Sequence, residues 1–234
     1  MKQAEKGIVL SRTSYSESSL ILKIITEHSG LQSFIFQGAK KKRVPFFPLQ
    51  LIEFEAYKRT DSQIGKISNL SSCHTLLDLI SNPVKSGISF FIAEICLKLM
   101  QENHSDKSLY DFLENEIIWL NSTPEISNYL VWFLAKLAKI EGFQPEVVSK
   151  TPSFFDLQEG KLSDSPPYFP SYLQENWLDG IVRSIEENKN QFLSRSYTKT
   201  ERNQLLEAWI SYYKVQHEQL KNLKSLEIIR AVFS

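Results

Sequence analysis

The sequence predicts a multi-domain chain of the α+β class, with a small β-barrel over residues 1–80 and an all-α helical domain over residues 81–234. Two observations support this division. Short β-rich runs with period-two alternation fill the segment from Gly7 to about Leu79, whereas apolar residues at helical spacing dominate after Pro83. With 234 residues and 42% hydrophobic content, the chain is long enough to bury a sizeable core.

Five runs before Pro83 are predicted to be strands: residues 7–13, 18–27, 31–39, 49–59 and 65–72. The turn residues Glu27–Gly30 predict a hairpin between the second and third runs. Five strands in about 75 residues fit a small closed barrel, for which the five-stranded OB-fold is the leading candidate. Apolar side chains alternate along the second and fourth runs, which places each set on one face of its strand: Leu20, Leu22 and Ile24; Ile52, Phe54 and Ala56.

Helical patterns occupy most of the remaining chain. Residues 85–103, 108–122 and 125–142 predict three consecutive helices; Pro124 and Glu125 favour a helix start, and Gly142 favours a stop. Residues 143–172 interrupt the pattern with five of the nine prolines and a turn at Glu159–Gly160, which predicts an irregular connector. Helices are expected again over residues 172–188, 200–220 and 223–233.

The overall formal charge of +0 hides a difference between the two regions. Residues 1–72 contain 11 basic and 6 acidic side chains, whereas residues 73–234 contain 16 and 21. This segregation points to a nucleic-acid or membrane surface at one end and a protein-facing body at the other. Only two cysteines are present, the N-terminus lacks the apolar run of a signal peptide, and no run approaches a membrane helix, so we expect a cytoplasmic protein.

Four consecutive basic residues, Lys40, Lys41, Lys42 and Arg43, follow the third predicted strand. Such a run can neutralise phosphates with a salt-sensitive affinity that ignores base sequence. The alternative is a solvated charge run that keeps a loop soluble. OB barrels bind single strands with a cationic groove and aromatic faces, although burial in the core is favoured for any one of the nearby aromatic residues: Phe34, Phe36, Phe46, Phe47 and Tyr57.

No catalytic motif is recognisable in the sequence. Nucleotide-binding Gly-Lys loops, serine-nucleophile elbows and zinc-peptidase motifs are absent. The four histidines are scattered, and His217, four residues after Tyr213 on a predicted helix, is expected to pack or cap that helix rather than bind a ligand. We therefore expect neither an enzyme nor a cofactor.

Several segments together resemble the RecO family of bacterial recombination mediators. The stretch "GIVLSRTSYSESSLILKIITEHSGLQSFIFQGAKKKR" carries an apolar strand, an Arg, a Tyr-x-Glu, a second strand ending in Thr-Glu-x-x-Gly, and a Gly-Ala followed by basic residues. "LKSLEIIR" at residues 223–230, after the helix with Tyr212, Tyr213 and His217, resembles the C-terminal end of the family. The resemblance spans the whole chain in order.

The resemblance implies a non-enzymatic protein with an OB-fold barrel on a helical domain. It implies binding of single- and double-stranded DNA, annealing of complementary strands coated by single-strand-binding protein, and loading of the RecA recombinase together with RecR, in association with the nucleoid. The residues that match the basic signature of the family would contact DNA: Arg12, Lys40, Lys41, Lys42 and Arg43.

One departure from the family concerns metal binding. Many members carry a four-cysteine zinc module after the segment that matches Gly142–Pro145, whereas this chain has no cysteine between residues 97 and 234. Structural zinc needs four N or S ligands, so no metal is expected. Aromatic and proline residues of the connector are expected to close it by packing, including Phe154, Phe155, Tyr168, Phe169 and Tyr172.

A partner site is expected on the helical domain. The C-terminal tail of single-strand-binding protein is acidic with an apolar end, so its receptor should be an apolar groove with a basic rim. The candidate rim residues are Lys136, Lys139, Arg195, Lys199 and Arg202. Two other functions remain open on the sequence: an OB-fold RNA-binding or translation-associated protein, and an adaptor that binds only proteins.

Overall fold

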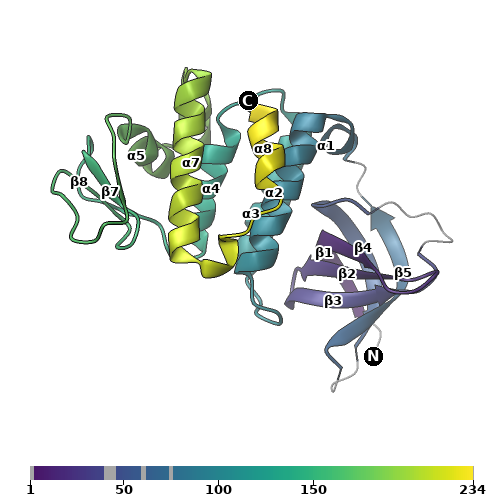
Figure 1. Ribbon diagram of the computed structural model, residues 1–234. Helices are drawn as coiled ribbons and strands as arrows, with labels where there is room; N and C mark the ends of the chain where they lie inside the picture. The colour runs from purple at the N-terminus through teal and green to yellow at the C-terminus, as the bar shows by residue number, and fades with distance from the viewer. Residues whose placement is uncertain (1–2, 40–45, 59–61, 74–75, 234) are drawn as a thin grey trace. The chain divides into compact units, whose positions relative to one another are not determined.

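The structure is a computed structural model that describes residues 3–39, 46–58, 62–73 and 76–233 (Figure 1). The chain divides into two compact units. Unit 1 comprises residues 1–122 and 223–232, and unit 2 comprises residues 123–222 with residues 233–234. The division after residue 80 stays a prediction, because contacts within one folded chain do not test which segment folds independently.

Unit 1 begins with five strands: β1 (Gln3–Ser14), β2 (Leu20–Thr26), β3 (Gly30–Phe36), β4 (Gln50–Tyr57) and β5 (Ile64–Cys73). They close into a barrel in the order β1-β2-β3-β5-β4. All neighbours are antiparallel except β3 and β5, which run parallel. Five strands and closure confirm the predicted barrel of the OB type, and the hairpin predicted at Glu27–Gly30 joins β2 to β3.

Inward-facing apolar side chains fill the barrel. Leu22 and Ile24 of β2 are fully buried, and the Phe34 ring packs edge-on against Phe54 with centroids 5.2 Å apart. The burial of both predicted sets confirms the alternation along β2 and β4. Because removing apolar surface from water stabilises a fold by about 25 cal/mol per Å², this shared interior is what holds the five short strands together.

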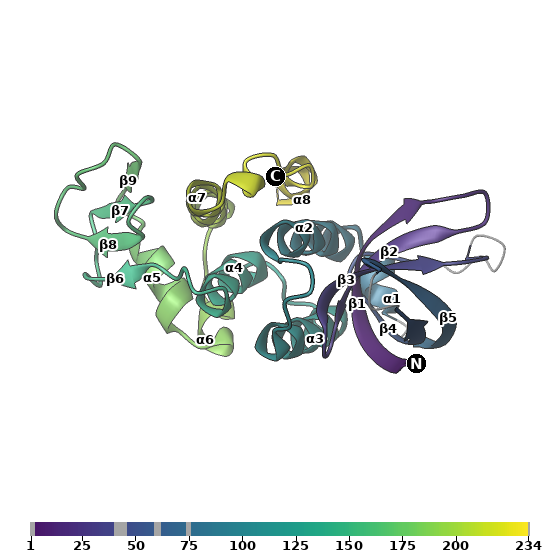
Figure 2. The same cartoon turned by 90° about the horizontal axis from the view of Figure 1, so that it is seen from below.

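The described residues of unit 1 also form four helices: α1 (Leu77–Ser81), α2 (Pro83–Leu99), α3 (Lys107–Ser122) and α8 (Leu226–Phe233). The short α1 was not predicted. Asn82 caps α2, because its side chain accepts a hydrogen bond from the backbone N–H of Val84 at 2.9 Å. Both views show α8 beside α2, so the C-terminal segment returns to the unit that contains the barrel (Figures 1 and 2).

A β-bulge in β1 allows two consecutive side chains of the strand to be buried, one in the barrel and one beside α2. The register with β2 shifts between Val9 and Ser11, and the consecutive residues Val9 and Leu10 are both buried. Val9 belongs to the barrel core. Leu10 instead lies at a hollow that is also lined by Ala93 and Leu97 of α2. The outer face of β1 is therefore partly covered by a helix at this point.

Glu94 of α2 holds the start of α8. Its carboxylate accepts hydrogen bonds from the backbone N–H groups of Lys224 (3.0 Å) and Ser225 (2.8 Å) and from the Ser225 hydroxyl (2.6 Å). Burial raises the pKa of Glu94, but the hydrogen bonds and the nearby Lys98 charge outweigh burial and bring the pKa below its ordinary value of 4.5. A lowered folded-state pKa means that the carboxylate contributes stability above pH 4.5 and loses it as the pH falls through the folded-state pKa.

Replacing Glu94 with Gln should therefore destabilise the protein in a pH-dependent way. We expect Glu94→Gln to lower the free energy of unfolding by about 1 kcal/mol at neutral pH, the usual cost of losing a helix cap. The difference should shrink in acid, because the wild-type carboxyl group is then protonated too. Urea unfolding across this pH range measures it, with the exposed Glu17→Gln as the control. A difference that stays constant in acid would contradict this role of Glu94.

Unit 2 contains α4 (Tyr129–Ile140), α5 (Asp179–Glu186), α6 (Lys189–Leu193), α7 (Lys199–Gln216) and the 3₁₀ turn η1 (Glu218–Leu220). The sequence predicted α4, α5 and α7, although not all of their boundaries. The predicted stop of α4 at Gly142 is confirmed, since the helix ends at Ile140 and Gly142 has φ +80°. The short α6 was not predicted. No helix within the described ranges is both long and apolar enough to cross a membrane.

Two predicted helix starts in unit 2 are wrong. The helix expected from Pro124–Glu125 begins only at Tyr129, after a turn in which the Tyr129 N–H donates to the Ile126 carbonyl at 3.2 Å. The helix expected from residue 172 begins at Asp179. Residues 172–174 instead pair with a strand of the connector, so tertiary pairing overrides the local helical pattern.

The connector is a small sheet rather than an irregular segment. Its strands β6 (Glu146–Val147), β7 (Phe154–Asp156), β8 (Lys161–Ser163) and β9 (Tyr172–Gln174) pair in the order β6-β8-β7-β9. The turn predicted at Glu159–Gly160 lies between β7 and β8, as expected. The correction has a simple cause: strands of two or three residues are too short to show period-two alternation.

Aromatic packing closes the connector, as the sequence predicts. Phe155 is fully buried and packs on Tyr212 of α7 with centroids 5.2 Å apart, while Phe154 contacts Tyr172 edge-on at 5.8 Å. The Tyr212 hydroxyl donates to the Phe143 carbonyl at 2.6 Å, and burial raises the pKa of Tyr212 to about 12. Tyr168 is 94% exposed and takes no part in this core.

Candidate nucleic-acid interface

The candidate interface lies at the end of the barrel where β1 turns into β2 and where β3 ends. Leu20, the first residue of β2, pairs with Ser14 on β1 and with Phe36, the last residue of β3. The turn between β1 and β2 and the segment that follows β3 therefore leave the barrel at the same end. This is the end to which the basic run is connected.

The basic run Lys40–Arg43 lies outside the described residues. The described residues that precede and follow residues 40–45 are Ala39 and Phe46, which are 0% and 1% exposed. Both belong to the barrel core, where the Phe46 ring contacts Phe36 edge-on at 6.0 Å. The segment that carries the run is thus attached to the barrel core at both of its ends.

Arg12 is the predicted DNA-binding residue that the structure does describe. It lies on β1, two residues before the strand ends, and pairs with Leu22 of β2. Its side chain is exposed and has no ion pair within the described part of the chain. A cation that is free at this end of the barrel is available to a phosphate. DNA contact at Arg12 and at the basic run stays a prediction.

Strand register adds Lys66 to this end of the barrel. Lys66 on β5 pairs with Ile35 of β3 and with Tyr57 of β4. Lys66 is exposed, and the Tyr57 side chain is 41% exposed. Sequence reasoning missed Lys66, because only the parallel pairing of β3 with β5 brings it beside the strand that leads to the basic run. A cation next to an exposed ring is a combination that barrels use to bind single strands.

The aromatic residues near the basic run differ in exposure. Phe34, Phe36 and Phe46 are at most 4% exposed, which confirms that burial is the better expectation for most of them. Phe47 is half-buried. Tyr57 alone among these five residues is exposed, so it is the one whose ring face can meet a base.

Loss of the Tyr57 ring should weaken single-strand binding. We expect Tyr57→Ala to lower the affinity for a single-stranded oligonucleotide about tenfold, because one stacked base contributes about 1–3 kcal/mol. The salt dependence should not change, since no charge is removed. Fluorescence anisotropy measures both quantities. Tyr57→Phe, which keeps the ring, and Tyr168→Ala, which removes an exposed ring from the connector, should bind like wild type; equal binding by Tyr57→Ala would exclude stacking at this residue.

The predicted partner rim in unit 2 is only partly available. The Lys136 ammonium donates to the Ile185 carbonyl at 2.7 Å, and burial, with a smaller effect of Lys139, lowers the Lys136 pKa. Arg195 pairs with Glu187, and Arg202 donates to the Tyr197 carbonyl at 2.6 Å. The two remaining rim residues, Lys139 and Lys199, are exposed.

One further basic residue near the rim, Lys189, was not predicted. Lys189 lies over the Trp132 ring at 5.1 Å and over the Tyr129 ring at 5.6 Å, and Lys136 lies over Trp132 at 5.7 Å. Two lysines thus gather at one indole. The i,i+4 spacing of Trp132 and Lys136 on α4 was readable from the sequence, whereas the position of Lys189 depends on how α6 packs.

The histidine singled out in the sequence packs against the start of the connector. His217 ends α7 and packs on Phe143 with ring centroids 4.6 Å apart, which confirms the packing or capping role that the sequence favours. Burial lowers the His217 pKa. Within the described part of the chain, no three His, Cys, Asp or Glu residues are grouped so that they could hold a metal ion.

Comparison with known proteins identifies the family. The family model "Recombination protein O N terminal" matches residues 1–76, and "Recombination protein O C terminal" matches residues 80–227. The DNA repair proteins RecO of Flavobacterium psychrophilum and Bacteroides fragilis are 28% and 27% identical to the chain, and each alignment covers all of both proteins. The RecO of Porphyromonas gingivalis is 26% identical over 97% of this chain and 98% of its own length. The matches cover the barrel and the helical part alike, so the chain belongs to the recombination protein O (RecO) family.

Proposed function

We propose that this protein is a non-enzymatic DNA-repair mediator that binds single- and double-stranded DNA through its barrel. The observation that carries the proposal is the exposure of three side chains on the barrel: Arg12 near the end of β1, and Lys66 with its pairing partner Tyr57 beside the last residues of β3. Family membership supports it, since the relatives are named DNA repair proteins. The proposed place of action is the nucleoid in the cytoplasm.

The chemistry of this surface suits strand annealing. Lysine and arginine side chains neutralise phosphates and release counterions without reading base sequence. A tyrosine ring stacks on the face of a base and leaves its Watson–Crick edge free. A strand held in this way remains able to pair with its complement. We infer that the protein brings together complementary strands coated by single-strand-binding protein and works with RecR to load RecA.

The tail of single-strand-binding protein has a proposed receptor in unit 2. An acidic tail with an apolar end requires cations beside an apolar surface. Lys139 and Lys199 are exposed and Lys189 lies over the Trp132 ring, whereas Lys136 already donates to the Ile185 carbonyl. Arg195 and Arg202 already bind groups of their own unit. Any contribution from these two arginines would therefore require them to exchange partners.

Binding assays distinguish this proposal from the two other functions. The protein is titrated into labelled single-stranded DNA, duplex DNA and RNA of one sequence at several salt concentrations, and RecR is tested by co-purification. We expect salt-sensitive binding to both DNA forms and a complex with RecR. Tighter binding to RNA without RecR association would favour the RNA-binding function, because 2′-hydroxyl contacts tell RNA from DNA. Failure to bind any nucleic acid would leave the adaptor function.

A further inference from the structure

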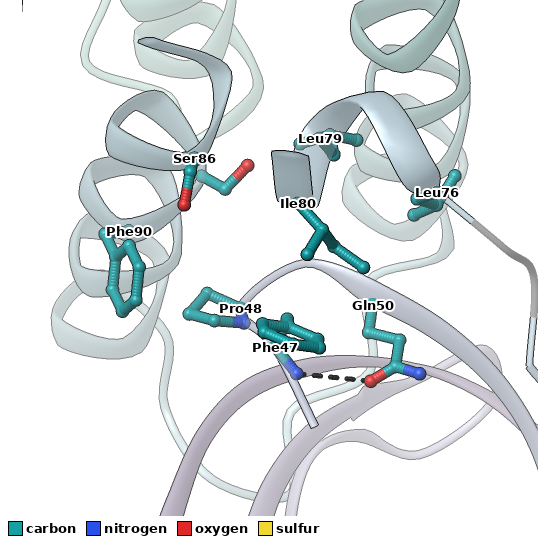
Figure 3. A pocket seen from close by; sticks show the side chains of 9 residues that line it. Phe47, Pro48, Gln50, Leu76, Leu79, Ile80, Ser86 and Phe90 are labelled. Atoms are coloured by element: carbon teal, nitrogen blue, oxygen red, sulfur yellow. Dashed lines mark hydrogen bonds between the residues drawn. The ribbon is translucent and has the colours of Figure 1, made fainter. Parts of the chain in front are cut away.

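An apolar furrow crosses unit 1 between the barrel and the helices. Two hollows compose it, and both are lined by Phe47, Pro48 and Phe90, so they share a wall. Figure 3 shows the first hollow, where Ile80 of α1 and Phe90 of α2 face Phe47 and Pro48. The second hollow has a volume of about 490 Å³ and reaches Ile228 of α8. We call the two hollows together the furrow.

Large apolar side chains line the furrow and are exposed to solvent. Ile80, Phe90 and Ile228 lie on three different helices and are 40%, 46% and 45% exposed. A single exposed apolar residue is ordinary, but several gathered in one concave surface are typical of a site for a partner. The furrow therefore has the chemistry of a docking groove.

Two hydrogen bonds fix the backbone at the floor of the furrow. The backbone N–H of Leu49 donates to the Val9 carbonyl at 2.7 Å, which ties the turn after Pro48 to β1. The Phe47 N–H donates to the Gln50 side-chain oxygen at 3.2 Å, as the dashed line in Figure 3 marks. A groove formed in advance binds with a smaller loss of conformational freedom.

Charge distinguishes the two ends of the furrow. The hollow around Ile80 has no charged residue among the residues that line it. The hollow around Ile228 has Arg12 and Lys224 at its edge. Its one acid, Glu94, already accepts three hydrogen bonds from Lys224 and Ser225. Neither Arg12 nor Lys224 has an ion pair in the described ranges, so this end of the furrow offers two free cations to a partner.

We propose that the furrow docks a segment of another protein that carries bulky apolar side chains and, at one end, acidic side chains. The apolar residues would occupy the larger hollow between Phe90 and Ile228, and the acidic end would lie against Lys224 and Arg12. Single-stranded nucleic acid fits less well, because its groove needs cations along the whole path of the backbone. This site is separate from the tail receptor, and it shares only Arg12 with the proposed DNA surface, so Lys224 is the basic residue that tests it.

Selection of binding peptides tests the proposal. Random peptides of about twelve residues are displayed on phage and selected on the full-length protein, and the consensus peptide is then synthesised with blocked ends and titrated. We expect the consensus to combine bulky apolar residues with Asp or Glu. The double variant Phe90→Ser with Ile228→Ser should lose at least about tenfold in affinity, as loss of a central apolar anchor does.

A charge exchange makes the test specific to the basic end. Lys224→Glu should weaken the acidic peptide and strengthen a matched peptide in which Lys replaces its acidic residues. Since all three substituted side chains are exposed, the variants should fold and bind single-stranded DNA like wild type. No enriched consensus, a basic consensus, or equal binding by the double variant would overturn the proposal. Loss of DNA affinity, or loss of a wild-type dimer in sedimentation, would overturn it as well, by assigning the furrow to DNA or to a second copy of the chain.

Discussion

Replacing Lys40, Lys41, Lys42 and Arg43 together with Ala should nearly abolish DNA binding at low salt. If each side chain contacts one phosphate, the slope of log affinity against log salt for single-stranded DNA should fall by about 3, at roughly 0.7 per contact. If the two proteins bind equally at about 1 M salt, that change corresponds at about 50 mM salt to an affinity loss of roughly four-thousandfold. The affinities for single-stranded and for double-stranded DNA should both fall, because both forms present phosphates. Anisotropy titrations over a salt series measure the slope and the loss together.

A matched control distinguishes the loss of phosphate contacts at the basic run from the loss of net positive charge. Lys150, Lys161, Lys214 and Lys221 are four lysines of unit 2, and their replacement with Ala removes the same charge from the other part of the chain. This control should bind DNA within about twofold of wild type, because none of its four lysines belongs to the proposed DNA surface. If both quadruple variants lost affinity equally, the effect would be one of net charge, and the barrel end would not be the binding surface.

Replacing Gly30 with Ala should cause the largest loss of stability among single substitutions considered for unit 1. Gly30 has φ +68°, and a Cβ there would overlap the carbonyl oxygen of His104. The overlap would push the β2–β3 hairpin away from the segment after α2, where the Asn103 N–H donates to the Leu31 carbonyl at 3.0 Å. We expect the free energy of unfolding to fall by about 3 kcal/mol, from backbone strain and this displacement combined.

Gly38 provides the matched control for this substitution. It has φ +72°, nearly the same backbone conformation, but a Cβ there would meet nothing within 4 Å. Gly38→Ala should therefore show the backbone strain alone, about 1 kcal/mol. Urea unfolding of the two variants isolates the steric contribution as their difference. Equal losses for both would show that the close approach of Gly30 to His104 has no energetic effect.

The barrel was predictable because its strands are long enough to show their alternation. The alternation of Leu20, Leu22 and Ile24 indicates one buried face even when the neighbouring strands are unknown, and all three residues are buried. Elements with short or tertiary-dependent patterns were not predictable. The residues of β9 have a helical sequence pattern, and only their pairing with β7 shows that they form a strand. The helix α6 spans too few residues to show a helical period.

The candidate site was predictable only where its residues are adjacent in sequence. The basic run and its position after the third strand are visible in the sequence itself. Lys66 belongs to the same end of the barrel through a parallel pairing of strands some thirty residues apart, which no local pattern encodes. The furrow likewise combines α1, α2, α8 and the segment before β4, so only the assembled unit reveals it.

Strand annealing tests the central claim most directly. Complementary strands are each coated with single-strand-binding protein, and their pairing is followed over time with wild type and with the variant in which Lys40–Arg43 are all Ala. The account predicts that wild type accelerates annealing and that the folded variant does not. A wild-type protein that binds DNA but never accelerates annealing would contradict the mediator function. Equal acceleration by both proteins would contradict the assignment of the basic run.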